Sequence, residues 1–201
     1  MRLAVTATSR LCDTTDLVHA ARLQSHAKIV RCSIDRSNCF ISIAPILDQK
    51  DKSRLTKFSS DHRSVFTLMN TPSKPRSIIF VCSRSEAENL ALQLQNLCSE
   101  STQLQREEIC HFHADIEPEI KRGIIVRFAN ELRVVVATTA FGTGMNFPDI
   151  RLIMHYCLPS SLSEYMQNIG RGGRDGQRYH CVCNTCFISA TRPFTSKELR
   201  G

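Results

Sequence analysis

The amino-acid sequence predicts an α/β fold in which helices cover both faces of a doubly wound parallel sheet. Short apolar runs alternate with segments of helical periodicity from residue 77 onward. Several of these runs are continuously apolar, which is typical of strands that are covered on both faces. The length of 201 residues suffices for one good core and leaves little room for a second complete domain. We therefore expect one domain plus a fragment.

Most strands of the main domain are expected to be followed by a helix. Strands are predicted at 77–82, 109–113, 133–137, 152–156 and 181–188, and helices at 83–97, 117–130 and 161–169. Ser83 and Glu86 have the spacing of a capping box, and Pro118 occupies a first-turn position. In such a sheet, ligands bind beyond the carboxyl ends of the strands.

The segment before residue 77 contains fewer elements. Strands are predicted at 3–8, 28–32 and 38–47, the last broken near Pro45, and helices at 14–24 and 51–69. Pro72 and Pro75 then mark a loop. Residues 1–35 hold too few elements to form a domain.

Charge and cysteine content narrow the classes of function. The net charge of +7 and the pI of 9.0 favour polyanionic partners such as nucleic acid. The ten cysteines are scattered, and Cys82, Cys110 and Cys157 fall in apolar runs where cysteine behaves as a small buried hydrophobe. We therefore expect a reducing compartment. No apolar run approaches the length of a membrane span, so we expect no membrane partner.

Three polar clusters are predicted to fall at strand-to-helix junctions, namely residues 82–84, 138–146 and 167–176. In the second cluster, hydroxyl groups and glycine amides follow a buried strand, an arrangement that cradles phosphate. In the third, Arg171 and Arg174 stand among glycines that let the backbone approach a ligand. Guanidinium groups in such a setting suit phosphate recognition. If this cluster is considered by itself, a basic surface turn would explain it equally well.

Taken together, the clusters resemble the ordered motifs of superfamily 2 helicases, and most closely those of the RecQ family. Residues 81–84 resemble motif IV, 137–151 resemble motif V, and 167–176 resemble motif VI. His113–Asp115 resembles the family's His-Ala-Gly turn. Residues 5–8 resemble motif III, and 34–38 resemble the segment that follows it. The resemblance covers nearly the whole chain.

The resemblance implies a division into domains. Residues 36–190 would form the second RecA-like domain of a helicase, and residues 191–201 a tail. Residues 1–35 would be the tail of the first, ATP-binding RecA-like domain.

The resemblance also implies a nucleotide site. Arg171 and Arg174 would act as arginine fingers on the γ-phosphate of ATP, and Gln167 would order their network. Asn146 would lie near the ribose, and Asp175 would steady the arginines. The implied cofactor-binding residues are Gly144, Asn146 and Asp175.

A nucleic-acid surface is implied beside the strand ends. Ser83, Arg84, Thr138 and Thr139 would face the phosphates of a bound strand, where hydroxyls, amides and arginine fix position without reading sequence. Such binding would be salt-sensitive and tolerant of sequence.

The chain departs from the family pattern at several positions. Asp115 stands where the family usually has glycine, Thr143 where it has methionine, Gly172 where it has alanine, and Ser37 where it has proline. We expect the fold to tolerate these changes.

The sequence contains neither a Gly-x-x-x-x-Gly-Lys-Ser/Thr P-loop nor an Asp-Glu-x-His box. Both belong to the first domain of a helicase, so ATP with Mg²⁺ is the implied cofactor of an intact two-domain enzyme only. We expect no ATP hydrolysis by the isolated chain; appreciable turnover that Arg171→Ala abolishes would contradict this.

The implied function is the carboxyl-terminal motor half of a nuclear 3′-to-5′ DNA helicase. Its partners would be ATP, single-stranded or partly duplex DNA, and the missing first RecA-like domain. Two alternatives remain open: an RNA helicase of the same superfamily, and a non-catalytic nucleic-acid-binding or regulatory fragment.

Cysteine and histidine also raise the question of a metal. Cys181, Cys183 and Cys186 beside His180 have a spacing that invites zinc, but they fall in the last predicted strand. We therefore expect zinc to be absent. His111, His113 and His155 lie on strands or their ends and are expected to be structural.

Overall fold

The computed structural model describes residues 14–24, 26–30, 35–44, 61–141, 145–157 and 159–184. Its elements, in chain order, are α1 (Thr14–Ala20), β1 (Cys39–Ala44), α3 (Asp61–Met69), β2 (Arg76–Phe80), α4 (Arg84–Asn96), the 3₁₀ helix η3 (Arg106–Glu108), β3 (Ile109–Phe112), α5 (Pro118–Asn130), β4 (Val134–Ala137), β5 (Ile150–His155), α6 (Leu162–Ile169) and β6 (Tyr179–Asn184).

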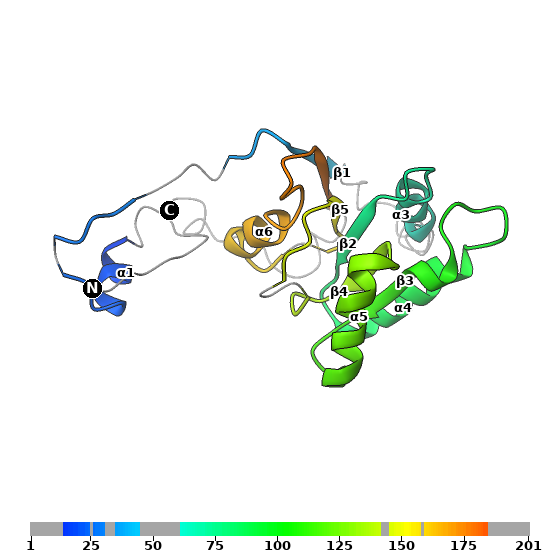
Figure 1. Ribbon diagram of the computed structural model, residues 1–201, viewed down its shortest axis with the longest axis horizontal. Helices are drawn as coiled ribbons and strands as arrows, with labels where there is room; N and C mark the ends of the chain where they lie inside the picture. The colour runs from blue at the N-terminus through cyan, green and yellow to red at the C-terminus, as the bar shows by residue number, and fades with distance from the viewer. Residues whose placement is uncertain are drawn as a thin grey trace, which may run out of the picture.

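The strands form one sheet in the order β1-β6-β5-β2-β4-β3, and every neighbouring pair is parallel. β2 lies in the interior of the sheet, and all of its residues are buried, as its continuous apolar run predicts. Helices lie on both sides of the sheet (Figure 1). The predicted doubly wound parallel fold is therefore confirmed.

Successive residues of β2 point to opposite faces, and each face has its own core. Ile79 packs with Leu94 and other residues of α4, together with α3, on one face. Ile78 packs with Phe128 of α5 and Ile169 of α6 on the other. Full burial of each such side chain contributes about 1.5–3 kcal/mol to folding, so these two cores hold the sheet between its helices.

The helix starts agree with the sequence signals. Ser83 caps α4 by accepting a hydrogen bond from the backbone of Glu86, whose side chain completes the predicted capping box. Pro118 begins α5, where its missing N–H has no cost. Ser161 caps α6 by accepting from the backbone of Glu164.

The segment before the sheet differs from expectation. Residues 28–30 lie in no strand and are exposed, so the predicted strand at 28–32 is wrong over that part. α1 buries none of its residues and lies away from the sheet (Figure 1). The predicted strand at 3–8 and the first part of the helix predicted at 51–69 lie outside the described residues. No helix in the described ranges is both long enough and apolar enough to cross a membrane.

Four aromatic rings fix the course of the chain between β4 and β5. Phe141 packs edge-on against Phe112 of β3 at 4.9 Å between ring centroids and against Phe128 of α5 at 5.4 Å. Phe147 packs against the same Phe128 at 4.9 Å. Both ends of the polar segment that begins at Thr138 are therefore held to one point on α5.

Tyr179, the first residue of β6, organises the turn between α6 and β6. Its side chain is fully buried and its hydroxyl donates to the carbonyl of Ile169 at 2.9 Å. A Cβ atom on Gly172 would lie 2.1 Å from the ring of Tyr179, and one on Gly173 would lie 2.5 Å from it. Gly173 also has a φ of +52°, a conformation that favours glycine. Glycine at these two positions is what lets the turn close over the ring.

The buried His155 should make the stability of the protein depend on pH. Its side chain is 1% exposed between the rings of Phe80 and Tyr165, and burial lowers its pKa to about 4. The imidazole of His155 takes up a proton near pH 6.5 in the unfolded chain and only near pH 4 in the folded chain. The free energy of unfolding is therefore highest above pH 6.5 and decreases as the pH falls toward 4. We expect a loss of about 3 kcal/mol of unfolding free energy between pH 7 and pH 4 from this residue.

Denaturant titrations of the chain across this pH range check the expectation. His155→Gln should remove most of the pH-dependent loss, whereas His180→Gln, at an exposed position of β6, should keep it. An identical pH dependence in the wild type and His155→Gln would show that His155 is not the source.

Restoring the alanine that the RecQ family usually has at position 172 should destabilise this chain. The new Cβ would overlap the ring of Tyr179, which has no free space to enter, so Gly172→Ala should lower the free energy of unfolding by about 1–3 kcal/mol. Gly123→Ala is the matched control, because nothing lies within 4 Å of a Cβ at that helical position. It should be neutral or stabilising by up to about 1 kcal/mol. Equal midpoints for the two variants would contradict the packing described here.

Candidate functional site

The cluster at 167–176 lies at the opposite edge of the sheet from the one predicted. It runs from the last turn of α6 toward β6, so it is a helix-to-strand junction and not a strand-to-helix junction. The backbone N–H of Gly173 donates to the carbonyl of Ile150, the first residue of β5, at 3.0 Å. The N–H of Asp175 donates to the carbonyl of Pro148 at 3.2 Å. These bonds place the cluster at the amino ends of the strands, beside the segment that leads into β5.

This edge brings Arg174 against Asn146 and places Arg171 beside the same small pocket as Arg174. Arg174 donates from Nη1 to the side-chain oxygen of Asn146 and to the carbonyl of Met145, each at 3.0 Å. Arg171 is 7% exposed, and burial together with the nearby charge of Arg174 lowers its pKa. Both arginines line a small pocket with Met145 and Phe147. The two arginine side chains therefore border the same small pocket.

The buried Arg76 holds the end of the segment that carries Asn146. Its Nη1 donates to the carboxylate of Asp149 at 2.7 Å and its Nη2 to the carbonyl of Ala129 at 2.9 Å. Its guanidinium also lies 5.5 Å from the ring centroid of Phe128. Burial lowers the pKa of Arg76, and the charge of Asp149 opposes that shift. The segment is thus fixed at both of its described ends.

Asp175 pairs with Arg151 of β5 and not with the two motif arginines. Arg151 donates from Nη1 to the carboxylate at 3.1 Å and from Nη2 to the other oxygen, and this contact lowers the pKa of Asp175. The carboxylate also accepts from the backbone of Gln177 at 3.1 Å. Direct support of Arg171 and Arg174 by Asp175 is therefore not what the structure shows.

The other two residues expected at the nucleotide site are placed differently. Gln167 is exposed near the end of α6. Gly144 lies outside the described residues.

Arg36 is a residue of this edge that sequence reasoning missed. It donates from Nη1 to the carbonyl of Gly170 at 3.2 Å and from Nη2 to that of Gly173 at 3.0 Å, while its guanidinium lies 5.3 Å from the ring centroid of Tyr179. Asn38 donates to the carbonyl of Gly173 at 2.8 Å. The segment at 34–38 had matched a family pattern, but the match gave no sign that its side chains bind the later turn.

The residues predicted to contact nucleic acid gather at the carboxyl ends of β2 and β4. The backbone N–H of Val81 donates to the carbonyl of Ala137 at 2.9 Å, so the two loops leave the sheet side by side. Thr138 and the exposed Thr139 follow β4 directly, and Ser83 opens α4 after β2.

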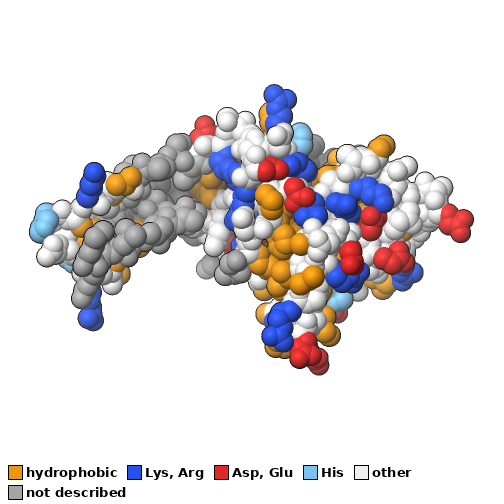
Figure 2. All heavy atoms as spheres, viewed as in Figure 1, with side chains coloured by type: hydrophobic (Ala, Val, Ile, Leu, Met, Phe, Trp, Pro, Cys, Tyr) orange, Lys and Arg blue, Asp and Glu red, His pale blue; other side chains and the backbone are white. Residues whose placement is uncertain are grey.

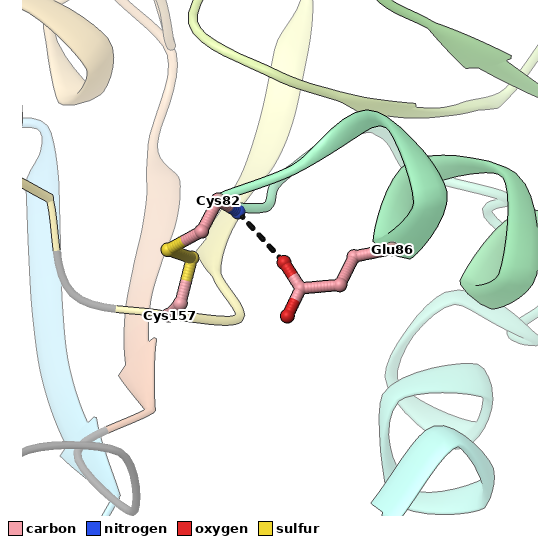
Figure 3. A group of neighbouring side chains, drawn as sticks. All are labelled: Cys82, Glu86 and Cys157. Carbon is pink, nitrogen blue, oxygen red and sulfur yellow. Dashed lines mark hydrogen bonds between the residues drawn. A yellow bond between two sulfur atoms is a disulfide. The ribbon is translucent and has the colours of Figure 1, made fainter. Parts of the chain in front are cut away.

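Carboxylates already occupy part of this edge. Glu86 accepts a hydrogen bond from the backbone N–H of Cys82 at 3.1 Å (Figure 3). It also accepts one from the backbone N–H of Ser83 at 3.1 Å. Arg84 forms an ion pair with Asp115, and the side chains of these two residues are 68% and 56% exposed. Asp115 is the residue that replaces the glycine of the family pattern. The groups expected to bind phosphate are thus partly engaged by the protein's own acidic side chains.

Cys82 and Cys157 form a disulfide that joins the ends of β2 and β5 (Figure 3). Their Cα atoms lie 6.2 Å apart. Cys82 is exposed and Cys157 is half-buried, so the interpretation of both as buried, reduced hydrophobes is wrong. The apolar runs that suggested it end one residue earlier, which turns the two side chains outward at the strand ends. A disulfide is also uncommon in a reducing compartment.

The cysteines that had invited a zinc interpretation lie in β6. Cys181 and Cys183 are both buried, and burial raises the pKa of each thiol, which disfavours the thiolate that zinc would need. Cys186 lies outside the described residues.

Positive charge is distributed and not concentrated on the face seen in Figure 2. There, Lys and Arg side chains alternate with Asp and Glu side chains around a patch of hydrophobic side chains. The net charge alone would therefore not locate a nucleic-acid surface.

Comparison with known proteins identifies the family of the chain. Residues 61–176 match the family described as "Helicase conserved C-terminal domain". The chain is 30% identical over 181 residues to the ATP-dependent DNA helicase Q-like 2 of Arabidopsis thaliana. This alignment covers 90% of this chain and 24% of that protein. It is 34% identical over 152 residues to the mouse ATP-dependent DNA helicase Q1, covering 75% of this chain and 21% of that protein. The chain thus spans about a quarter of the length of these relatives.

A solved structure shows the same fold. Dbp5 of S. cerevisiae, bound to RNA and ADP BeF3, superposes with a TM-score of 0.65 at 17% identity over 89% of this chain and 43% of that one. The sheet is therefore RecA-like, as the resemblance implies. With its family match and its RecQ-type relatives, the chain belongs to the helicase conserved C-terminal domain family and is a RecQ-like member of it.

Proposed function

We propose that this chain is the carboxyl-terminal motor half of a RecQ-like DNA helicase, which couples ATP hydrolysis to 3′-to-5′ movement on DNA when joined to a first RecA-like domain. The observation that carries the proposal is the hydrogen bond of Arg174 to Asn146 beside a small pocket that Arg171 and Arg174 both line, at the sheet edge opposite the hydroxyl-bearing loops. One edge can then face a nucleotide while the other faces a nucleic-acid strand.

The arginine pocket is suited to an anion. Burial, and after it the like charge of Arg174, lowers the pKa of Arg171, so the two guanidinium groups repel each other. A γ-phosphate placed between them would relieve this repulsion and accept charge-assisted hydrogen bonds from both. In this proposal the first domain supplies the P-loop and the carboxylate that holds Mg²⁺, and the arginines act on charge that develops at the γ-phosphate. The isolated chain would then bind nucleotide weakly and hydrolyse none.

The opposite edge is suited to the phosphates of a single strand. Thr138 and Thr139 offer hydroxyl groups directly after β4, with Ser83 and Arg84 beside them after β2. These groups carry no base specificity, so the surface would bind many sequences. DNA is preferred as the substrate because the RecQ-type relatives are named DNA helicases. Work on DNA would place the protein in the nucleus.

Fluorescence anisotropy with a labelled single-stranded oligodeoxythymidine tests the nucleic-acid edge. The chain should bind with an affinity that falls as salt rises, and Thr139→Glu should weaken binding about 10-fold or more, because it sets a negative charge against the strand. Thr67→Glu, at an exposed position of α3, is the matched control and should bind like the wild type. Unchanged binding by Thr139→Glu would place the strand elsewhere.

Removing the carboxylate of Asp115 should strengthen DNA binding. In Asp115→Asn, Arg84 loses its ion-pair partner and becomes available to a phosphate, so affinity should rise several-fold and log K should fall more steeply with log salt, by roughly 0.7 for one added contact to a single strand. The control is Glu119→Gln, which removes a comparable exposed carboxylate from an ion pair with Arg122. Weaker binding by Asp115→Asn, in anisotropy titrations at several salt concentrations, would mean that Arg84 needs Asp115 for its position.

A further inference from the structure

One side-chain cluster lies outside both edges described above. It consists of Glu88 on α4, His111 on β3 and His113 directly after β3. One donor atom from each residue can be chosen so that all three lie within 4.8 Å of one another. β3 is the edge strand of the sheet, and α4 packs over the same end, so the fold itself brings a helix carboxylate against two imidazoles.

The two histidines are arranged as parallel plates. Residues two apart on a strand point to the same face, and the ring centroids of His111 and His113 lie 5.6 Å apart with their planes 9° from parallel. The Nε2 atom of His113 lies 3.0 Å from Oε1 of Glu88. Two imidazoles and a carboxylate thus face a common point.

These separations fit a tetrahedral metal ion. Ligand bonds of about 2.0–2.1 Å in tetrahedral geometry place neighbouring donor atoms roughly 3.3 Å apart. The Glu88 and His113 donors are already close to that spacing, and a turn of the half-buried His111 ring would bring in the third. The hard ions Ca²⁺ and Mg²⁺ prefer oxygen ligands, whereas two imidazoles select zinc and its neighbours among the transition metals.

The surroundings hold the two rings in place. His111 is half-buried on β3 and stacks on His113. His113 is itself 7% exposed, which limits its freedom to turn away.

We propose that Glu88, His111 and His113 form a binding site for a divalent transition-metal cation of the Zn²⁺ type. For Nε2 of His113 to bind the metal, its hydrogen bond to Glu88 breaks and its proton passes by way of solvent to Nδ1 of the same ring, so that a neutral imidazole and the Glu88 carboxylate form metal–ligand bonds together with His111. No redox change is involved. The proposal does not rest on the helicase function.

An open groove along β3 and α5 gives the fourth coordination position to solvent. Glu88, His111 and His113 line this groove together with Asp115, Ile116 and Ile120. A water molecule or a small ligand entering the groove could complete the coordination sphere. A bound ion would tie the edge strand to α4 immediately before the turn that carries Asp115, and so would stiffen the loop that faces Arg84.

Cobalt titration of the full chain tests the site, because tetrahedral Co²⁺ gives visible d–d absorption while spectroscopically silent Zn²⁺ can then displace it. Accessible thiols are alkylated first, which excludes thiolate binding. We expect the wild type to bind one Co²⁺, and both His111→Ala and Glu88→Gln to weaken this binding at least 10-fold. His180→Ala, at an exposed histidine of β6, should bind as the wild type does.

Thermal unfolding with and without Zn²⁺ distinguishes a variant that has lost the metal site from one that has failed to fold. Glu88→Gln changes an exposed helix position and should fold normally without metal, yet lose the rise in Tm that Zn²⁺ gives the wild type. Equal cobalt binding by the wild type, His111→Ala and Glu88→Gln would overturn the proposal, and so would the absence of tetrahedral d–d absorption in the wild type.

Discussion

The packing of the turn after α6 against the ring of Tyr179 is the contact on which the arginine pocket depends. The ring fills the space where side chains at positions 172 and 173 would otherwise stand, and its hydroxyl holds the last turn of α6. Arg36 lies over the ring and donates to carbonyls on either side of the two glycines. A backbone clamped in this way presents Arg171 and Arg174 in a fixed relation to each other. Glycine at position 172, where the family usually has alanine, is therefore matched to a tyrosine seven residues later in the chain.

The parallel sheet separates two kinds of chemistry. Strands that all run one way put their carboxyl ends at one edge, where backbone N–H groups and hydroxyls meet, and their amino ends at the other. The arginine turn occupies the amino-end edge because it follows a helix, and it reaches the segment before β5 through Gly173 and Asp175. Phe141 and Phe147 both pack against Phe128. Thr138 therefore lies at the carboxyl-end edge of the sheet, and Asn146 lies at the amino-end edge. In this proposal, nucleotide and nucleic acid are contacted by the two ends of the same chain segment.

Much of the fold follows from local signals in the sequence. Continuous apolar runs identified β2 and β4, and Ser83 with Glu86 identified the start of α4, because burial and capping depend on residues close in the chain. The edge on which the arginine turn lies was predicted wrongly, since a turn that leaves a helix was taken for one that leaves a strand. The ion pair of Arg84 with Asp115 and the disulfide of Cys82 with Cys157 join residues 31 and 75 positions apart, and no local pattern encodes such contacts. Glu88 likewise could not be predicted as a neighbour of His111 and His113, because only the packing of α4 against β3 brings it to them.

The most direct measurement of the central claim is ATP hydrolysis by a fusion that joins the first RecA-like domain of a RecQ helicase to the amino end of this chain. With single-stranded DNA present, the fusion should turn over ATP, and Arg174→Ala should reduce the rate by about 10³-fold or more, as expected for an arginine finger. Arg178→Ala removes another exposed arginine, which packs on Phe40, and should leave the rate unchanged. A fusion that does not turn over ATP, or one whose rate is insensitive to Arg174→Ala, would contradict the account.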